Sequence, residues 1–191
     1  MLDTNQGKTK ADANLVKLTL KNPENFALII EKYQKPFFYY IKRISNISDE
    51  DIEDELQEIF LKIYQNLNNY KTDLKFSSWV YRIARNHIIS HYRKIKARPQ
   101  KISNDWEINE SILQNIATDL NLADEMEHKL LAQKIKLTLD KLDLKYKEVL
   151  IYKFFEEKTY DEISDIIKKP TGTVGTLINR AKKQFIKIYE Q

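Results

Sequence analysis

The sequence has no cysteine, and its 191 residues include only 3 glycines and 4 prolines. The lack of cysteine excludes a disulfide framework, a thiolate zinc site and thiol redox chemistry. Glycine and proline interrupt helices, so their scarcity beside abundant Lys, Leu, Ile, Glu and Asn favours an all-α protein. A hydrophobic content of 42% is enough for each half of the chain to form a core.

Long apolar segments are also missing. No apolar run approaches the roughly 20 residues that a helix needs to cross a bilayer. The first residues do not resemble a secretory signal. We therefore expect a protein of the reducing cytoplasm, without direct insertion into a membrane.

The charged residues are segmented along the chain, although the net charge is only +4. Residues 49–58 hold seven acids and no base, whereas residues 71–101 hold nine bases and one acid, Asp73. Residues 102–127 hold seven acids and neither Lys nor Arg. Such blocks indicate surfaces with different partners.

Apolar periodicity divides the chain into two small helical domains. From residue 26 to residue 44, apolar side chains recur at three- and four-residue steps, which predicts a helix with a buried face. We expect an N-terminal tail at 1–14 and a first domain at 15–97. Residues 98–127 start with Arg98-Pro99 and lack sustained periodicity, which predicts an acidic linker with some helix near 119–131. A second domain of short helices is expected at 128–191.

A first functional helix is predicted from Ser48, which can cap it with Asp51, to about Leu67. A helical projection places seven apolar residues on one buried stripe: Ile52, Leu56, Ile59, Phe60, Ile63, Tyr64 and Leu67. The opposite face carries Asp54, Gln57, Glu58, Leu61 and Gln65. This face could simply be a solvated acidic surface, but Leu61 near its centre favours a protein contact.

A second functional helix follows the loop 69–77, with Ser77 as its expected N-cap. Its inward side carries Trp79, Val80, Ile83, Ala84, His87 and His91. Its other side carries Arg82, Arg85, Tyr92, Arg93 and Lys96. Basic and aromatic side chains beside an aromatic loop suit contact with a nucleic-acid backbone and stacking on bases, although the same face could serve only solubility.

His87 and His91 stand at i and i+4, a spacing that can bind zinc on a helix. The glutamate of the corresponding hydrolase motif is replaced by isoleucine, and the third histidine, His128, lies beyond the linker. We therefore interpret both histidines as core or capping residues and expect neither a metal nor a catalytic residue.

The third element is a pair of helices. Thr159 and Glu162 form a capping box for a helix to about Ile167, and residues 168–171 turn the chain into a second helix. That second helix would bury Val174, Leu177, Ile178, Ala181 and Phe185. It would present Thr173, Thr176, Arg180, Lys183 and Lys187 outward. Hydroxyl and guanidinium groups reach base edges while lysines neutralise phosphates, so this pattern predicts a DNA-binding helix-turn-helix; the alternative is a basic helical hairpin at the surface.

These motifs resemble those of RNA polymerase sigma factors of the extracytoplasmic-function group, in the sigma-70 family. Residues 51–61, DIEDELQEIFL, are similar to the acidic helix of sigma region 2, and residues 76–86, FSSWVYRIARN, to its promoter-facing helix. Residues 160–164, YDEIS, with 170–174, PTGTV, and 179–183, NRAKK, resemble the region 4 helix-turn-helix. The resemblance implies two helical domains, sigma region 2 and region 4, joined by the acidic linker.

The resemblance also implies partners. Core RNA polymerase would be bound at its β′ coiled coil and β flap, with Asp54, Gln57, Glu58 and Leu61 on the β′ coiled coil. The -10 element and its flipped base would be held by Asn69, Tyr70, Lys71, Phe76, Ser77, Trp79, Arg82, Arg85 and Asn86. The -35 element would be read through Thr173, Thr176, Asn179, Arg180 and Lys183.

The resemblance further implies an anti-sigma factor as a partner, no chemistry by the protein itself, and no cofactor. Family members thread the linker through the polymerase active-site cleft and RNA exit channel, where its acidity would mimic RNA; a plain acidic tether would have the same composition.

Two positions depart from the family pattern. Gly175 stands where a basic residue usually follows Gly-Thr-Val, and Leu142-Asp143 replaces the usual Leu-Pro at the start of the second domain. The main alternative function is a dimeric helix-turn-helix regulator that is not a subunit of polymerase. A metal-dependent hydrolase that uses the histidines is a third.

Overall fold

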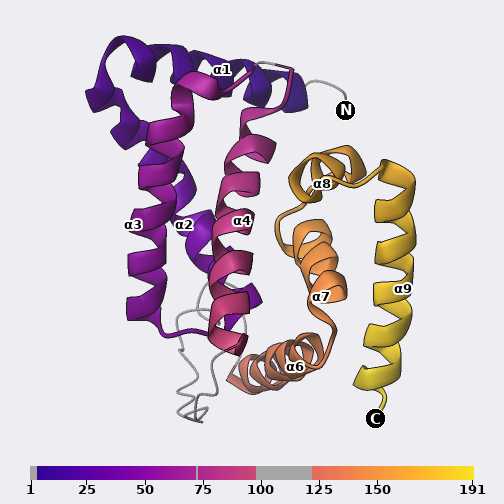
Figure 1. The fold of residues 1–191 in the computed structure, drawn as a ribbon. Coiled ribbons are helices and arrows are strands. Elements are labelled where there is room, and N and C mark those ends of the chain that lie inside the picture. The colour runs from indigo at the N-terminus through magenta and orange to yellow at the C-terminus, as the bar shows by residue number, and fades with distance from the viewer. Residues whose placement is uncertain (1–3, 72, 98–121) are drawn as a thin grey trace.

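The computed structural model describes residues 4–71, 73–97 and 122–191, and all regular elements in these ranges are helices (Figure 1). The predicted all-α fold is confirmed. No helix within the described ranges is long and apolar enough to cross a membrane.

The first half of the chain is a bundle of three helices crossed at one end by a fourth (Figure 1). Its elements are α1 (Thr4–Lys21), the 3-10 turn η1 (Pro23–Asn25), α2 (Phe26–Ser45), α3 (Asp49–Asn66), the 3-10 turn η2 (Leu67–Asn69) and α4 (Phe76–Ala97). The expected boundary between tail and first domain, at residue 14, lies inside α1. The side chain of Asp12 is buried and binds Lys32 of α2, so α1 is fastened to the bundle from before that boundary.

Helix α3 begins as the sequence predicts. The hydroxyl of Ser48 accepts a hydrogen bond of 3.1 Å from the Asp51 amide. Six of the seven residues of the predicted stripe are buried, but Tyr64 is 45% exposed. Its ring packs edge-to-face with the ring of Phe26 at the start of α2, with 5.0 Å between the centroids.

Helix α4 starts at Phe76, one residue before the predicted cap. The carbonyl of Lys75 accepts the hydrogen bond from the Trp79 amide, so Lys75 takes the capping position and Ser77 lies in the first turn. Phe76 is fully buried. Its ring packs against Trp79 at 5.6 Å and Tyr70 at 5.2 Å.

The second half contains α6 (Leu122–Asp140), α7 (Leu144–Leu150), the π-helical turn η3 (Ile151–Phe155), α8 (Tyr160–Ile167) and α9 (Thr171–Tyr189). Most of the predicted linker, residues 98–121, lies outside the described residues. The structure therefore does not test the hypothesis that the linker mimics RNA. Its last residues belong to α6, which therefore spans the expected boundary at 127. Helix α6 packs on α9, with Lys134 over the Tyr189 ring at 4.1 Å.

The predicted helix-turn-helix is formed by α8 and α9. The capping box is complete: Thr159 Oγ1 accepts from the Glu162 amide, and Glu162 Oε2 accepts from the Thr159 amide at 2.9 Å. Helix α8 ends at Ile167, and the next residue, Lys168, has a φ of 53° that turns the chain toward α9. Val174, Ile178 and Ala181 of α9 are buried, which fixes the face that α9 turns outward.

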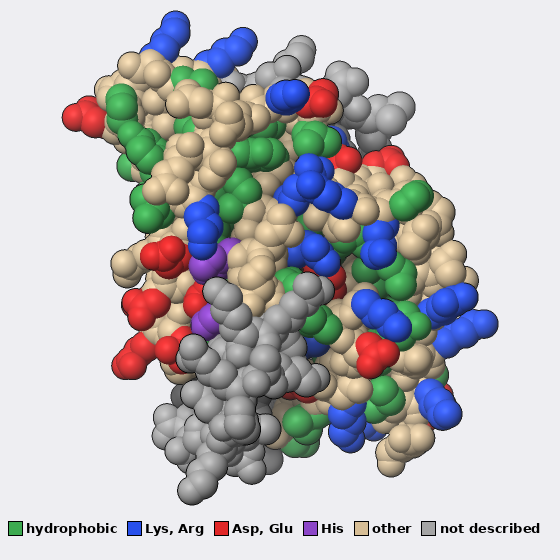
Figure 2. Space-filling model, viewed as in Figure 1, with side chains coloured by type: hydrophobic (Ala, Val, Ile, Leu, Met, Phe, Trp, Pro, Cys, Tyr) green, Lys and Arg blue, Asp and Glu red, His purple; other side chains and the backbone are tan. Residues whose placement is uncertain are grey.

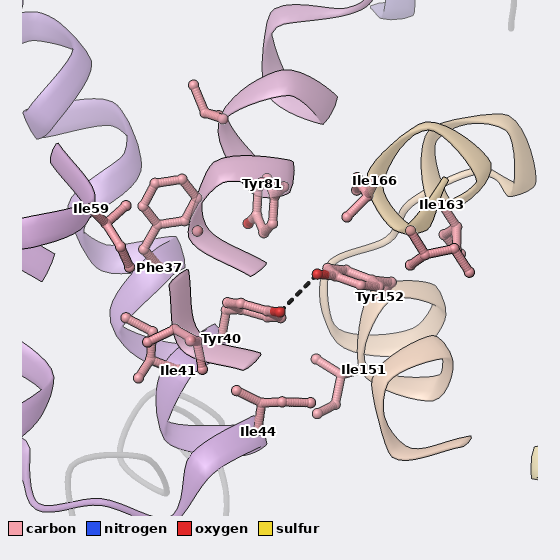
Figure 3. Close-up of a cluster of buried hydrophobic side chains, with 14 of the residues drawn as sticks. Phe37, Tyr40, Ile41, Ile44, Ile59, Tyr81, Ile151, Tyr152, Ile163 and Ile166 are labelled. Atoms are coloured by element: carbon pink, nitrogen blue, oxygen red, sulfur yellow. Dashed lines mark hydrogen bonds between the residues drawn. The ribbon is translucent and has the colours of Figure 1, made fainter. Parts of the chain in front are cut away.

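The two halves pack against each other through α4 with α8 and α2 with α7 and η3 (Figures 1 and 3). At the centre of the junction, the Tyr152 hydroxyl donates to the Tyr40 hydroxyl at 2.7 Å, and the two rings stack at 5.3 Å. Both side chains are fully buried. One hydrophobic core therefore runs from the first half into the second.

Candidate protein and nucleic-acid interfaces

The outer face of α3 is an exposed acidic surface with an apolar border. Asp54, Gln57 and Glu58 are exposed, and Leu61 among them is 49% exposed. In Figure 2 the acidic side chains gather along the edge of the molecule where α3 lies. A groove of about 700 Å³ between α2 and α3 borders this face; Gln57, Leu61 and Tyr64 line it together with Phe26 and Ile30.

The loop between η2 and α4 is held by its aromatic residues. The Tyr70 hydroxyl donates to the Leu74 carbonyl at 2.6 Å, which closes the loop, and partial burial raises the pKa of this phenol. Asn69 and Lys71 are exposed, whereas Ser77 and Trp79 are half-buried. Phe76, which was predicted to contact DNA, is a fully buried core residue. Its ring packs against the rings of Tyr70 and Trp79.

The basic face of α4 is turned toward the second half of the molecule. Arg85 forms a two-pronged ion pair with Glu148, in which its Nη2 donates to Oε2 at 3.0 Å. The side chains are 22% and 5% exposed, respectively. Arg82 Nε donates to the Asp165 carbonyl at 2.7 Å, and Lys75 of the loop binds Glu162 at 3.2 Å.

Asn86, which the resemblance assigns to the -10 contact, is exposed. The side chains of Tyr92, Arg93 and Lys96 lie outside the described part of the chain. The periodicity identified the polar face of α4 but not the domain that covers its first half.

Sequence reasoning missed two buried carboxylates at this junction, Glu148 and Glu156. Glu156 accepts hydrogen bonds from the Tyr81 hydroxyl at 2.5 Å and from Arg43 at 3.1 Å. Burial raises the pKa of Glu156, although Tyr81 and Arg43 oppose the shift. A signal for Glu148 existed, because this acid directly precedes the apolar run Val149 to Tyr152 and could therefore be expected near a core.

The two histidines of α4 bind a carboxylate of α3. His87 Nε2 contacts Glu55, His91 Nδ1 lies 2.7 Å from the same carboxyl group, and Lys62 contacts Nδ1 of His87. Within the described ranges, no group of three His, Asp or Glu side chains is placed to hold a metal ion. The arrangement joins α3 to α4 and gives the metal-dependent hydrolase no support.

Helix α9 presents its polar side outward. Thr173, Thr176, Asn179, Arg180 and Lys183 are all exposed. In Figure 2 basic side chains spread over the side of the molecule that α9 forms. A Cβ atom at Gly175 would lie 3.6 Å from Cε2 of Tyr160, an ordinary contact, so packing does not require glycine there.

Comparison with known proteins gives a consistent assignment for both halves. Residues 29–98 match the family described as Sigma-70 region 2, and residues 132–185 match Sigma-70, region 4. The chain is 29% identical over 168 residues to the ECF RNA polymerase sigma factor SigW of Bacillus subtilis, covering 83% of this chain and 85% of SigW. It is 30% identical over 166 residues to the RNA polymerase sigma-H factor of Pseudomonas aeruginosa, covering 83% and 82%.

Two solved structures are similar over most of the chain. One is CnrH in complex with the cytosolic domain of CnrY, with a TM-score of 0.69, 18% identity and coverage of 94% of this chain and 97% of that chain. The other is the sigma factor RpoE of Bartonella quintana in complex with the anti-sigma factor NepR, with a TM-score of 0.64, 15% identity and coverage of 87% and 98%. At sequence identities this low, the similarity of the two structures to this chain shows a shared fold only.

Proposed function

The chain belongs to the extracytoplasmic-function group of the sigma-70 family, and we propose that α3 binds core RNA polymerase while α4 and α9 bind the promoter. As a sigma factor, the protein acts in transcription initiation. In this proposal each of the three helices has a separate task.

Helix α3 is the proposed contact with the β′ coiled coil of core polymerase. Exposed carboxylates at Asp54 and Glu58 suit a basic partner, and Leu61 with the adjoining groove offers apolar area that such a contact would bury. Charges at the rim guide association and apolar residues at the centre supply most of the affinity. This face thus has both properties of a specific protein interface.

The loop 69–75 and the first half of α4 are proposed to hold the opened -10 element. Base capture requires an aromatic surface for stacking and polar groups for the base edges. Trp79 and Tyr70 supply the rings, and Asn69, Lys71, Arg82 and Arg85 supply polar groups beside them. Arg82 and Arg85 face the second half in this conformation, so binding the -10 strand needs the halves to separate.

Helix α9 is proposed to read the -35 element, and its face is the observation that carries the proposal. Buried Val174, Ile178 and Ala181 anchor the helix, and the opposite side presents hydroxyl, amide, guanidinium and ammonium groups to solvent. A helix exposed in this way fits the major groove, where arginine reads guanine and asparagine reads adenine. The β flap is the proposed polymerase contact of this half.

An anti-sigma factor is the proposed inhibitor, because the similar CnrH and RpoE structures were solved with CnrY and NepR bound. We further propose that the protein acts in the cytoplasm, where core polymerase meets the promoter.

The test is transcription in vitro with core polymerase, the purified chain and a genomic library. We expect tight association with core and initiation at a set of promoters that share -35 and -10 sequences. A dimeric regulator would instead bind duplex sites without core and start no transcripts. Failure to bind core would contradict the proposal.

A further inference from the structure

Helix α1 precedes the segment that matches Sigma-70 region 2, which begins at residue 29, yet it packs beside the part of region 2 that is proposed to hold the -10 element. It contacts η2, which leads into the loop 69–75, and α4, which follows that loop. In Figure 1, α1 crosses the end of the bundle at which α3 ends and α4 begins. Helix α1 therefore lies against both ends of the loop.

A buried charge, Asp12, fixes this position of α1. The side chain of Asp12 is only 8% exposed, and one of its oxygens binds the ammonium group of Lys32. The other oxygen accepts a hydrogen bond of 3.4 Å from the Tyr33 hydroxyl. An aspartate is almost never buried without partners, and removing one partner of a buried ion pair is costly. Asp12 therefore holds α1 to α2 at one defined place.

Tyr33 connects the Asp12 carboxylate to the aromatic rings of the loop. The buried Tyr33 ring meets Phe76 edge-on, with 6.0 Å between the centroids. Phe76 in turn packs against Tyr70 and Trp79, the two rings proposed to stack on an extruded base. Burial raises the pKa of both Tyr33 and Tyr70, and the Asp12 carboxylate adds to each shift. Asp12 thus lies within electrostatic range of the loop as well as within reach of α2.

We propose that α1 is a brace for the loop 69–75 and that Asp12 is its positioning residue. Asp12 acts through Tyr33 and Phe76, which keep the rings of the loop where a base can stack. Rings that are already in place lose less freedom on binding, so the brace raises the affinity for the captured base without contacting DNA. This inference rests on the proposed function of the loop and adds the residues that support it.

Two substitutions test the brace without touching the proposed DNA or polymerase contacts. Asp12→Asn keeps the size of the side chain and removes its charge. Tyr33→Phe removes only the hydroxyl that meets Asp12 and keeps the ring that packs on Phe76, so the core is preserved if the first variant fails to fold. Lys17→Gln is the matched control, because Lys17 is an exposed charge on the same helix. Circular dichroism and binding of a -35 duplex report whether each variant is folded.

The position of the loop is measured by the fluorescence of Trp79 in a Trp106→Phe background, since the chain has only these two tryptophans. Under native conditions we expect Asp12→Asn and Tyr33→Phe to shift the emission of Trp79 and to increase its quenching by acrylamide. Lys17→Gln should match the unsubstituted background. A loss of global stability alone would leave the emission of the folded state unchanged, so this measurement separates positioning from stability.

Base capture is measured with core polymerase saturated by each variant. The probes are single-stranded oligonucleotides with the -10 sequence of a promoter found by the transcription experiment, intact or with an abasic site at each position in turn. The captured base is the one whose removal weakens wild-type binding most, by at least about tenfold. In Asp12→Asn and Tyr33→Phe this difference should fall below about threefold, while binding of core and of the -35 duplex stays at the wild-type level.

Folded variants that keep the wild-type emission of Trp79, or the wild-type difference between the intact and the abasic oligonucleotide, would overturn the brace. Either result would leave base capture by the loop intact, because the wild type would still distinguish the two oligonucleotides. A wild-type holoenzyme that binds both oligonucleotides equally would be the separate failure of the proposed base capture, and the brace would then have no function to support.

Discussion

Lys62 donates a hydrogen bond to Nδ1 of His87, and this contact favours the neutral form of the imidazole. An ammonium group has donors and no acceptor, so Nδ1 must be the unprotonated ring nitrogen. The other nitrogen, Nε2, then carries the proton that it donates to Glu55. His87 is therefore a neutral link between a cation and an anion at the α3–α4 contact.

Stability should fall when the pH is lowered through the range in which His87 becomes charged. Burial lowers the pKa of His87, Lys62 adds to this effect and Glu55 opposes it. A base with a lower pKa in the folded state stabilises the fold fully above the pKa of the unfolded chain, about 6.5, and this stability is lost as the pH falls further. Urea unfolding between pH 7.5 and pH 5 should thus give decreasing free energies. One group contributes a slope of at most about 1.4 kcal/mol per pH unit.

In His87→Gln this part of the slope should disappear. The comparison uses the free energy of unfolding of both proteins at each pH. An identical pH dependence in the variant would show that His87 is charged in the folded protein or has no part in the stability.

The double variant Asp54→Ala, Glu58→Ala should bind core polymerase at least about tenfold more weakly, which is ~1.4 kcal/mol. Both side chains are exposed, and the pair of Glu58 with Lys62 at 3.8 Å is a surface contact of little energetic weight. The free energy of unfolding should change by less than about 0.5 kcal/mol. The control is Glu31→Ala, Glu190→Ala, which removes two exposed acids elsewhere. An unchanged affinity for core in a titration would remove α3 from the interface.

Arg180→Ala and Lys183→Ala should weaken promoter binding in different ways. For Arg180→Ala we expect a loss of about 1–3 kcal/mol on the specific -35 duplex and relaxed discrimination at the base it reads. For Lys183→Ala we expect a uniform loss on all duplexes and a smaller dependence on salt, because one phosphate contact is gone. The measurement is duplex affinity at several salt concentrations. Equal losses for Arg180→Ala on specific and random duplexes would show that Arg180 does not read a base.

Local features of the fold could be predicted because their causes lie within a few residues. Ser48 and the Thr159–Glu162 box fixed two helix starts, since capping depends on neighbouring side chains. The polar faces of α3 and α9 followed from helical periodicity in the same way. The start of α1 was not predicted, because a polar, weakly amphipathic segment gives little periodic signal. The helix expected near 119–131 agrees with α6, which begins at Leu122.

The junction could not be predicted, because periodicity distinguishes polar from apolar faces but does not say what covers a polar face. Arg85 and Glu148 are distant in sequence, and each was consistent with an exposed residue or with a buried pair. Tyr64 shows the converse error: an apolar position on the predicted stripe lies at the surface, where it borders a groove. Only the three-dimensional arrangement thus shows that the second half of the chain covers the basic face of α4.

In the proposed function, the chain enables core polymerase to open promoters through the loop 69–75. The loop is closed by Tyr70 and Leu74 and lies against Trp79, so its groups are held where an extruded base could stack. Replacing residues 69–75 by a flexible Gly/Ser segment should leave core binding and closed-complex formation nearly unchanged. A premelted promoter should rescue the variant only in part, because it removes the cost of opening but not the need for base capture.

The most direct measurement is permanganate reactivity of promoter thymines on linear duplex DNA. Core polymerase with the wild-type chain should make the thymines of the -10 region reactive, and core polymerase with the loop variant should leave them largely unreactive although the complex forms. Wild-type reactivity in the variant would contradict this role of the loop, since promoter opening would then not depend on it.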